Sequence, residues 1–366
     1  MNRRPHCILP LPVLLMGLCA LMLAGAAPAS AQQLAFTIFV GGYPLGAIPT
    51  GFAFAGNKFV GAVADSRTNT DYLFSTDLNG GHVQRFAPNL NLPGPNPDGE
   101  HCVAGSLGLG GFPKWDIYVA AGDGVLHITN DGTTSDMFVT SLAGPVRSIR
   151  FDAVGTFGHD MLVSTHGGQV YRVNGSGIPT LLVSLGGDIE AMDVAPIGAG
   201  FGGYDGQLIA ATEALGGIFA ISPSGAVTKL QQVFFPIESI NFVPMNVGES
   251  GSLVEGLYIA DYPSDIVKAS ANQFSAFKGD AIISDEVHIQ EVFRMHWNGS
   301  AFEISLIGSS STGATSNAEA GIFVTPAMIT NGSGCPVIEP TPDPFCPPVC
   351  HRVPKAPRVA GANSED

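Results

Sequence analysis

The sequence predicts an all-β fold, a six-bladed β-propeller that is closed by an N-terminal strand and followed by a disordered, Pro-rich tail. The first reason is a repeat, because residues 71–86, DYLFSTDLNGGHVQRF, closely match residues 160–173, DMLVSTHGGQVYRV. The second is that short apolar segments recur every ~45 residues, a period typical of propeller blades. The third is composition, since only 13% of residues are charged and 47 are glycine, which favours short strands and tight turns.

The N-terminus has the pattern of a secretory signal peptide. Arg3 and Arg4 precede the apolar run 7–23, and small residues follow up to Ala31. We therefore assign residues 1–31 to a cleaved signal and predict a secreted or periplasmic protein. After this leader no apolar run reaches the roughly 20 residues of a membrane helix, so no transmembrane segment is expected.

The propeller is expected to span residues 32–333. Residues 34–40 form a strand that would complete the final blade and lock the ring. Each of five successive units has an acidic residue or glycine, then an apolar second strand, a tight turn and a third strand. The second strands read YLFST, IYVAA, MLVST, QLIAA and LYIAD, and the third strands read HVQRF, VLHIT, QVYRV, GIFAI and DIVKA.

Innermost strands precede these segments and complete the predicted blades. Three of them align well: Val146–Phe151, Ile189–Val194 and Ile237–Phe242. A sixth, weaker unit fits between residues 285 and 326 and contains FEISLIG and GIFVTP. Four strands to a unit describe a propeller blade, whereas a linear β-solenoid would need shorter repeats. Almost no helix is expected.

The C-terminal segment, residues 334–366, is rich in proline and is expected to be a flexible tail. It contains Cys335, Cys346 and Cys350, while Cys102 lies within the repeats. An even number of cysteines in an exported protein suggests disulfides, but four cysteines allow three pairings. The sequence does not choose between these pairings.

The chain is acidic, with a formal net charge of −15. A negative field repels phosphate backbones, so we expect no nucleic-acid partner. The expected partners are a small-molecule or carbohydrate-like ligand, or a protein. The acidity also has a simpler explanation, because net charge keeps an exported protein soluble.

The strand EGLYIAD, residues 255–261, and the turn SPSG, residues 222–225, resemble motifs of six-bladed propellers of the NHL and gluconolactonase-like superfamily. This resemblance implies a fold and not a reaction. Members of the gluconolactonase-like group hold a catalytic divalent cation in the channel through Glu, Asn and Asp. The nearest equivalents here form the predicted metal set, with Ca²⁺ as the possible cofactor: Glu190, Glu238, Asn241 and Asp193. Strand alternation would send Glu190 and Asp193 to opposite faces.

Ligands of propellers bind around the central channel, where innermost strands begin and second strands turn into third strands. Applied to the alignment, this rule selects ligand-binding residues and one histidine that should converge on an acidic channel mouth. The innermost strands contribute Arg147, Glu190 and Glu238, and the turns contribute Asp77, Asp123, His166, Glu213 and Asp261. Each also has a structural explanation: Arg147 could pair with Glu190 across the channel, and Asp123 and His166 could serve only the geometry of their turns.

Two functions follow from this site. The first is an exported binding or scaffold domain with an acidic, possibly calcium-binding ligand site at the channel. The alternative is a metal-dependent hydrolase of lactone or ester substrates, with His166 or Glu238 as catalytic base. The sequence contains no G-x-S-x-G elbow and no P-loop.

Overall fold

The structure, a computed structural model, describes residues 33–41, 48–64, 71–95, 99–214, 216–261, 265–286, 291–310 and 318–330. The predicted signal peptide, the Pro-rich tail and the cysteines of that tail lie outside these residues. Cys102 is a free cysteine. In the part of the chain that is described, no helix is long and apolar enough to cross a membrane.

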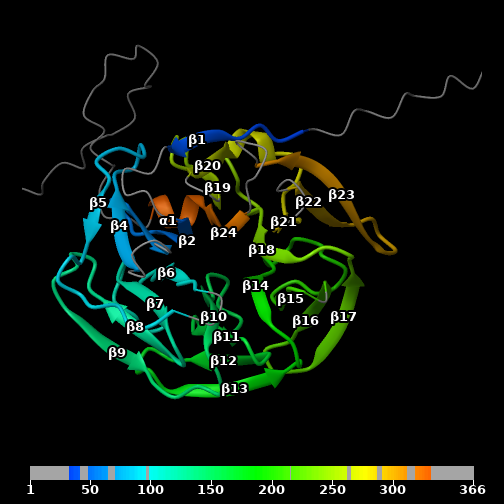
Figure 1. Ribbon diagram of the computed structural model, residues 1–366. Coiled ribbons are helices and arrows are strands. Elements are labelled where there is room, and N and C mark those ends of the chain that lie inside the picture. The colour runs from blue at the N-terminus through cyan, green and yellow to red at the C-terminus, as the bar shows by residue number, and fades with distance from the viewer. Residues whose placement is uncertain are drawn as a thin grey trace, which may run out of the picture. The chain divides into compact units, whose positions relative to one another are not determined.

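Six antiparallel sheets of four strands each surround a common axis, which confirms the predicted six-bladed propeller (Figure 1). In blades 1 to 4 the strands follow the chain from the axis outward. Blade 1 contains β2 (Ile48–Phe54), β3 (Phe59–Ala64), β4 (Tyr72–Thr76) and β5 (Gln84–Phe86), and blade 2 contains β6 (Val103–Gly105), β7 (Ile117–Ala121), β8 (Gly124–Ile128) and β9 (Ser135–Val139). Blade 3 contains β10 (Val146–Phe151), β11 (Met161–Thr165), β12 (Gln169–Val173) and β13 (Pro179–Ser184), and blade 4 contains β14 (Ile189–Val194), β15 (Leu208–Thr212), β16 (Gly217–Ile221) and β17 (Val227–Gln232).

Blades 5 and 6 exchange strands. Blade 5 contains β18 (Ile237–Phe242), β21 (Ala281–Asp285), β22 (Glu291–Trp297) and β23 (Phe302–Ser309). Blade 6 contains β24 (Ala318–Val324), β19 (Gly256–Asp261), β20 (Asp265–Ser270) and β1 (Thr37–Val40). The chain leaves β18, forms β19 and β20 in the next blade, and returns through the 3₁₀ turn η1 (Ala271–Phe274) to β21. Neither blade can therefore form without the other.

This exchange corrects two predicted groupings. LYIAD and DIVKA form β19 and β20 of blade 6, so they do not share a blade with Ile237–Phe242. FEISLIG belongs to β23 of blade 5, whereas GIFVTP begins within β24 of blade 6. Because the buried strands of both blades have similar sequences, the strands were assigned to blades by their order in the chain. That order differs from the strand order in the sheets here. The N-terminal strand does complete the final blade, as predicted, because Thr37 pairs with Lys268 of β20.

The two repeat copies also occupy different places. Tyr72–Thr76 is the third strand of blade 1, whereas Met161–Thr165 is the second strand of blade 3. The hairpin of β2 and β3 supplies the first two strands of blade 1, and the repeat pattern did not include it. Because neighbouring strands are antiparallel, the turns after a second and a third strand lie at opposite ends of a blade.

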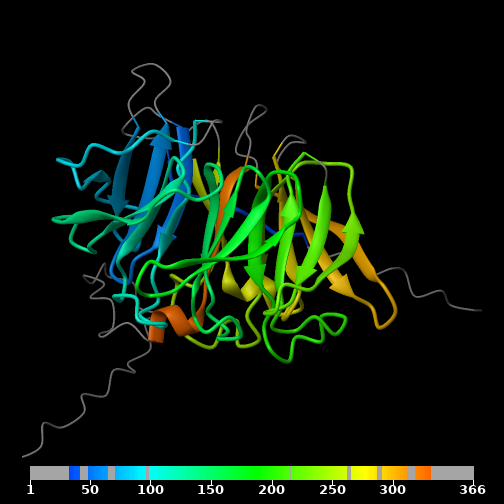
Figure 2. The same cartoon turned by 90° about the horizontal axis from the view of Figure 1, so that it is seen from below.

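Aromatic side chains close the ring between blades 6 and 1. The Phe59 ring lies 4.8 Å from Tyr258, and Phe39 of β1 lies 5.2 Å from Phe59 and 4.9 Å from Tyr258. The two contacts of Phe39 are edge-to-face, and the Phe59–Tyr258 pair is tilted; such contacts add to the stabilisation from the apolar area that each ring buries. The last described element, α1 (Pro326–Thr330), lies inside the ring in Figure 1 and at the lower edge in Figure 2. Met328 of this helix lines a cavity within the channel.

Candidate functional site

Five innermost strands carry a β-bulge at the same position, near the end of the channel opposite α1. In each pairing one residue of the innermost strand is skipped, so two residues face one on the second strand. The skipped residues are Thr50 in blade 1, Arg147 in blade 3, Glu190 in blade 4, Glu238 in blade 5 and Glu319 in blade 6. All five line one cavity, so the bulges aim these side chains at the axis. We call this region the channel mouth.

Arg147 lies at the centre of the channel mouth, with only 3% of its side chain exposed. Its guanidinium forms ion pairs with Glu190 at 2.7 Å, Glu213 at 3.1 Å and Asp188 at 3.3 Å, and it also pairs with Glu100. Burial disfavours the charged form, but Glu190 and Glu100 outweigh this effect and raise the pKa of Arg147 above its ordinary value. The side chain is therefore a permanent cation that neutralises part of the acidic cluster.

Three glutamates on blades 5 and 6 belong to the same acidic cluster, and their pKa values are raised. Burial, followed by repulsion from Glu190 and Glu100, raises the pKa of Glu238 well above its ordinary value. Burial and the proximity of Glu100 raise the pKa of Glu319 to about 9, and burial also raises the pKa of Glu286. Glu319 therefore holds its proton at neutral pH, and burial favours the protonated form of Glu238 and Glu286 as well.

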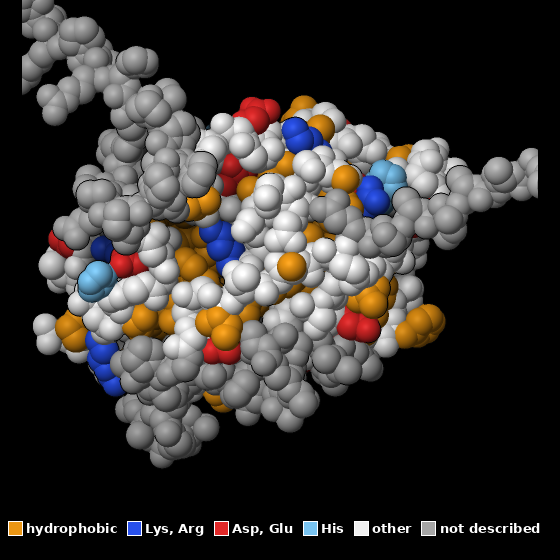
Figure 3. Space-filling view, turned by 90° about the horizontal axis from the view of Figure 1, so that it is seen from above, with side chains coloured by type: hydrophobic (Ala, Val, Ile, Leu, Met, Phe, Trp, Pro, Cys, Tyr) orange, Lys and Arg blue, Asp and Glu red, His pale blue; other side chains and the backbone are white. Residues whose placement is uncertain are grey.

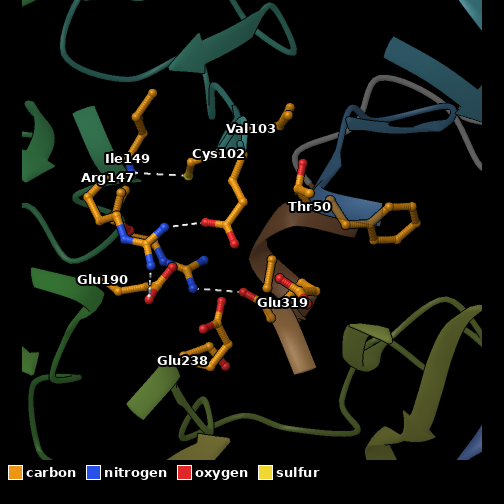
Figure 4. Close-up of a pocket in the computed structure, with 16 residues that line it drawn as sticks. Thr50, Cys102, Val103, Arg147, Ile149, Glu190, Glu238 and Glu319 are labelled. Atoms are coloured by element: carbon orange, nitrogen blue, oxygen red, sulfur yellow. Dashed lines mark hydrogen bonds and ion pairs between the residues drawn. The ribbon is translucent and has the colours of Figure 1, made fainter. Parts of the chain in front are cut away.

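The Glu238 side chain points into the cavity (Figure 4). Only 4% of Glu238 is exposed, and its Oε1 atom has no hydrogen-bond partner among the described residues. A buried polar atom without a partner carries an energetic cost, which a ligand with a hydrogen-bond donor would remove. The cavity has a volume of about 40 Å³. That is room for a few water molecules or a small charged group.

His166 lies at the edge of this cluster. Its Nδ1 atom is 2.8 Å from Asp188 Oδ2, and 42% of its side chain is exposed. Burial raises the pKa of Asp188 to about 6, although Arg147 and His166 oppose this shift. The pair is a possible proton acceptor beside the mouth.

Arg150 divides the channel below the mouth. Its Nε donates to the Met192 carbonyl at 2.9 Å, and its Nη2 donates to the Gly321 carbonyl at 2.7 Å and to Asn241 Oδ1 at 3.2 Å. A second cavity of about 90 Å³ lies on the other side, where Met328 of α1 lines it. Three innermost strands are thus tied together by one side chain.

Two of the predicted metal residues lie in this deeper layer. Asp193 Oδ2 accepts a hydrogen bond from the Phe242 amide at 2.7 Å, and Asn241 contacts Arg150. Both line the lower cavity, whereas Glu190 and Glu238 line the upper one. The bulge at Glu190 shifts the alternation, so Glu190 and Asp193 both line the channel, at different depths.

Calcium takes six to eight oxygen ligands. Among the described residues, no group of three His, Cys, Asp or Glu side chains is arranged to hold a metal ion. Arg147 already supplies a positive charge at the centre of the carboxylates. The side chains in this arrangement therefore do not fit a calcium shell.

Of the predicted ligand-binding residues, the structure brings together Arg147, Glu190, Glu238, Glu213 and His166. Asp77 lies at the opposite end of blade 1, in the turn after the third strand, where its carboxylate accepts the Asn79 and Gly81 amides at 2.8 Å each. Asp123 is exposed in the hairpin turn between β7 and β8. Asp261 is fully buried at the end of β19 in blade 6.

The sequence interpretation missed four acidic residues of the cluster: Glu100, Asp188, Glu286 and Glu319. Asp188 lies two residues before Glu190 and was available from the same alignment. Glu319 occupies the bulge of β24, the position that Glu190 and Glu238 occupy in their strands. Glu286 follows β21, the true second strand of blade 5, so it holds the turn position that was assigned to Asp261.

No family model and no curated protein matches the chain. Solved structures that resemble it include a streptogramin B lyase, with 13% identity over 77% of this chain and 76% of that chain and a TM-score of 0.46. Virginiamycin B lyase from Staphylococcus aureus is 12% identical over 75% and 88% of the two chains, with a TM-score of 0.42. A protein of unknown function from Bacteroides thetaiotaomicron is 10% identical over 78% and 63%, with a TM-score of 0.46. These values carry no argument about activity, and the propeller assignment depends on the strand pairing described above.

Proposed function

We propose that this chain is an exported binding protein whose channel mouth takes a positively charged group of its ligand, an ammonium or a guanidinium. The ligand is a small molecule or a side chain of a protein partner. The observation that carries the proposal is the buried Glu238 carboxyl, whose Oε1 faces the cavity without a hydrogen-bond partner among the described residues.

The charge of the channel mouth supports the same conclusion. Glu100, Asp188, Glu190 and Glu213 share the charge of Arg147, while the raised pKa values of Glu238, Glu286 and Glu319 favour their protonated, neutral forms. An incoming cation would replace a proton and lower the pKa of the carboxyl that it contacts. An anionic ligand would add repulsion to a region that already holds an excess of acid.

Titration with n-butylamine, followed by calorimetry at pH 8, tests this proposal. Butylamine should bind, and 1-butanol, which has the same chain without the charge, should not. Glu238→Gln should weaken amine binding about tenfold, the effect of removing one charged partner worth ~1.4 kcal/mol. Glu249→Gln makes the same change at an exposed position and should have no effect.

Equal binding of the amine and the alcohol would show that charge is not recognised. Equal amine binding by the wild type and Glu238→Gln would show that the ligand does not use the buried carboxyl. Either result contradicts the proposal.

Calcium stays a prediction. Since the described side chains do not form a calcium shell, its binding would require them to rearrange. A melting curve in EDTA and then in excess CaCl₂ tests it, because a ligand that binds only the folded state raises the melting temperature. A rise that Glu238→Gln abolishes would establish a metal site at the mouth.

A hydrolase of lactone or ester substrates is the second candidate, and the His166–Asp188 pair is the observation that favours it. An imidazole oriented by a carboxylate is suited to general base catalysis. A panel of lactones and esters, assayed with and without added divalent cations, tests this function. Turnover that is lost in His166→Ala would support this function. Absence of turnover for every lactone and ester tested would contradict it.

Export is part of the proposal, and the predicted signal peptide supports it. N-terminal sequencing of the protein from a secreting host should give Gln32 as the first residue. An intact Met1 in the cell interior would contradict export.

A further inference from the structure

An open groove lies between blades 4 and 5 at their outer strands. Its volume is about 460 Å³, in the range of ligand sites. Phe235 and Phe293 stack in it with ring centroids 4.5 Å apart and an interplanar angle of 13°, and Phe234 beside them is 97% exposed. Asp285 and Glu291 also line the groove. Asp285 is fully buried and Glu291 is partly exposed, so the accessible surface of the groove is mainly aromatic with one carboxylate.

The groove and the channel mouth are connected by one short piece of chain. Phe235 lines the groove and Glu238, three residues later, lines the mouth cavity. Three extended residues span at most about 11 Å. The β-ladder gives the same proximity, because Ile237 pairs with Asp285, which lines the groove. The residues that line the two places are therefore no more than about 11 Å apart along the chain.

Figure 3 shows one side of the ring. Acidic, basic and hydrophobic side chains are scattered over it among uncharged ones, and no large patch of one kind dominates. At the groove, the exposed ring of Phe234 lies beside the Phe235–Phe293 stack, and the nearby channel mouth holds the concentrated acid. Complementarity to both requires a partner with an apolar group and a positive charge that are at most about 11 Å apart.

We propose that the groove and the mouth together bind an extended peptide of a partner protein. A lysine or arginine of this peptide enters the channel mouth, and an apolar side chain two or three positions away packs on Phe234 and Phe293. This inference depends on the proposed function, because the mouth must accept the basic side chain. An extended chain advances about 3.3 Å per residue, so two or three positions cover about 7–10 Å, within the limit given above. Buried aromatic anchors and a paired charge are the usual sources of peptide affinity.

Fluorescence anisotropy with labelled peptides and the full chain tests this. The parent peptide carries one lysine and one phenylalanine, separated by one to five positions in a series of Gly-Ser peptides. Binding should be tightest at a separation of two or three. Acetylation of the lysine, or replacement of the phenylalanine by serine, should each weaken binding at least tenfold.

Matched variants separate the groove from the fold. Phe234→Ala removes a fully exposed ring, so it should leave the melting temperature and butylamine binding unchanged and weaken the parent peptide about tenfold. Leu253→Ala removes another exposed apolar side chain, 85% exposed and distant in sequence, and should change nothing.

The outcomes distinguish this inference from the proposed function. Absence of butylamine binding would contradict both the proposed function and the peptide site. Normal butylamine binding, with no gain from the phenylalanine and no effect of Phe234→Ala, would remove the peptide site alone. A free arylalkylamine that binds as tightly as the peptide would show a small-molecule site, and a dimer that Phe234→Ala dissolves would show a second copy of the chain in the groove. Both would overturn the peptide proposal.

Discussion

Two arginines on one strand, three residues apart, have opposite roles. Arg147 stands in the bulge of β10 and is surrounded by carboxylates, whereas Arg150 donates to the backbone carbonyls of Met192 and Gly321 and to Asn241. The partners of Arg147 are themselves titratable and exceed it in charge. Most partners of Arg150 are neutral groups whose hydrogen-bonding capacity it satisfies.

This difference distinguishes the Arg147 layer, a candidate ligand site, from the Arg150 layer, which is a structural contact between strands. The Arg150 layer is complete, because each donated hydrogen bond meets a fixed acceptor. The Arg147 layer is incomplete, because Glu238 and Glu319 must hold protons to remain buried. Substitutions at the two layers should therefore respond differently to pH, which makes the comparison testable.

The largest effect is expected for Arg147→Met. Loss of the cation leaves Glu190, Glu213, Asp188 and Glu100 without their counter-charge. Breaking a buried ion pair in this way costs about 3–5 kcal/mol. Urea unfolding should show this loss at pH 8 and a smaller one at pH 5, where more of the carboxyl groups are protonated. An equal loss at both pH values would mean that the cluster does not depend on Arg147 for charge balance.

Arg150→Met should cost less, about 2–3 kcal/mol, because it removes charge-assisted hydrogen bonds to neutral carbonyls. The loss should change less between pH 5 and pH 8 than the loss for Arg147→Met, because the hydrogen-bond acceptors of Arg150 are neutral and Asp193, whose pKa is raised by burial and lowered by Arg150, is the nearby carboxyl. The two variants thus serve as controls for one another. A pH-dependent cost at Arg150 and a constant cost at Arg147 would reverse the assignment of the two layers.

The smallest effect concerns Glu319. Its pKa is raised to about 9 in the folded chain from a usual value near 4.5, so the native state binds more protons than the unfolded state between these values. Stability is therefore fully present below about pH 4.5 and falls as the pH rises toward 9. Glu319→Gln should flatten this fall and raise the melting temperature at pH 9 by roughly 2–4 °C, the shift produced by about 1 kcal/mol. A steeper fall in the variant would contradict the raised pKa.

Much of this site could be predicted from the repeats. The alignment of Val146–Phe151, Ile189–Val194 and Ile237–Phe242 placed Arg147, Glu190 and Glu238 in one column, and the structure places them around one cavity. Their shared position proved to be a bulge, which no periodicity reveals because the skipped residue looks like any other strand residue. The repeat alignment therefore identified these three channel residues without any information about the bulge.

The remaining part depended on contacts between distant segments. Glu319 and Glu286 were missed because the chain exchanges β19 and β20 between blades 5 and 6, so sequence order does not match strand order there. Glu100 was missed because the strand that follows it, β6, is only three residues long and gives no pattern. Asp77 was misplaced because blade 1 begins with a hairpin outside the repeat.

The central claim is that the channel mouth exchanges protons for a positively charged group. Calorimetry of butylamine binding at pH 7.5, in two buffers with different ionisation enthalpies, counts the protons released. The account predicts a release approaching about one proton per amine bound, smaller in Glu238→Gln, and affinity that increases with pH. Amine binding without proton release, or binding that tightens as the pH falls, would contradict it.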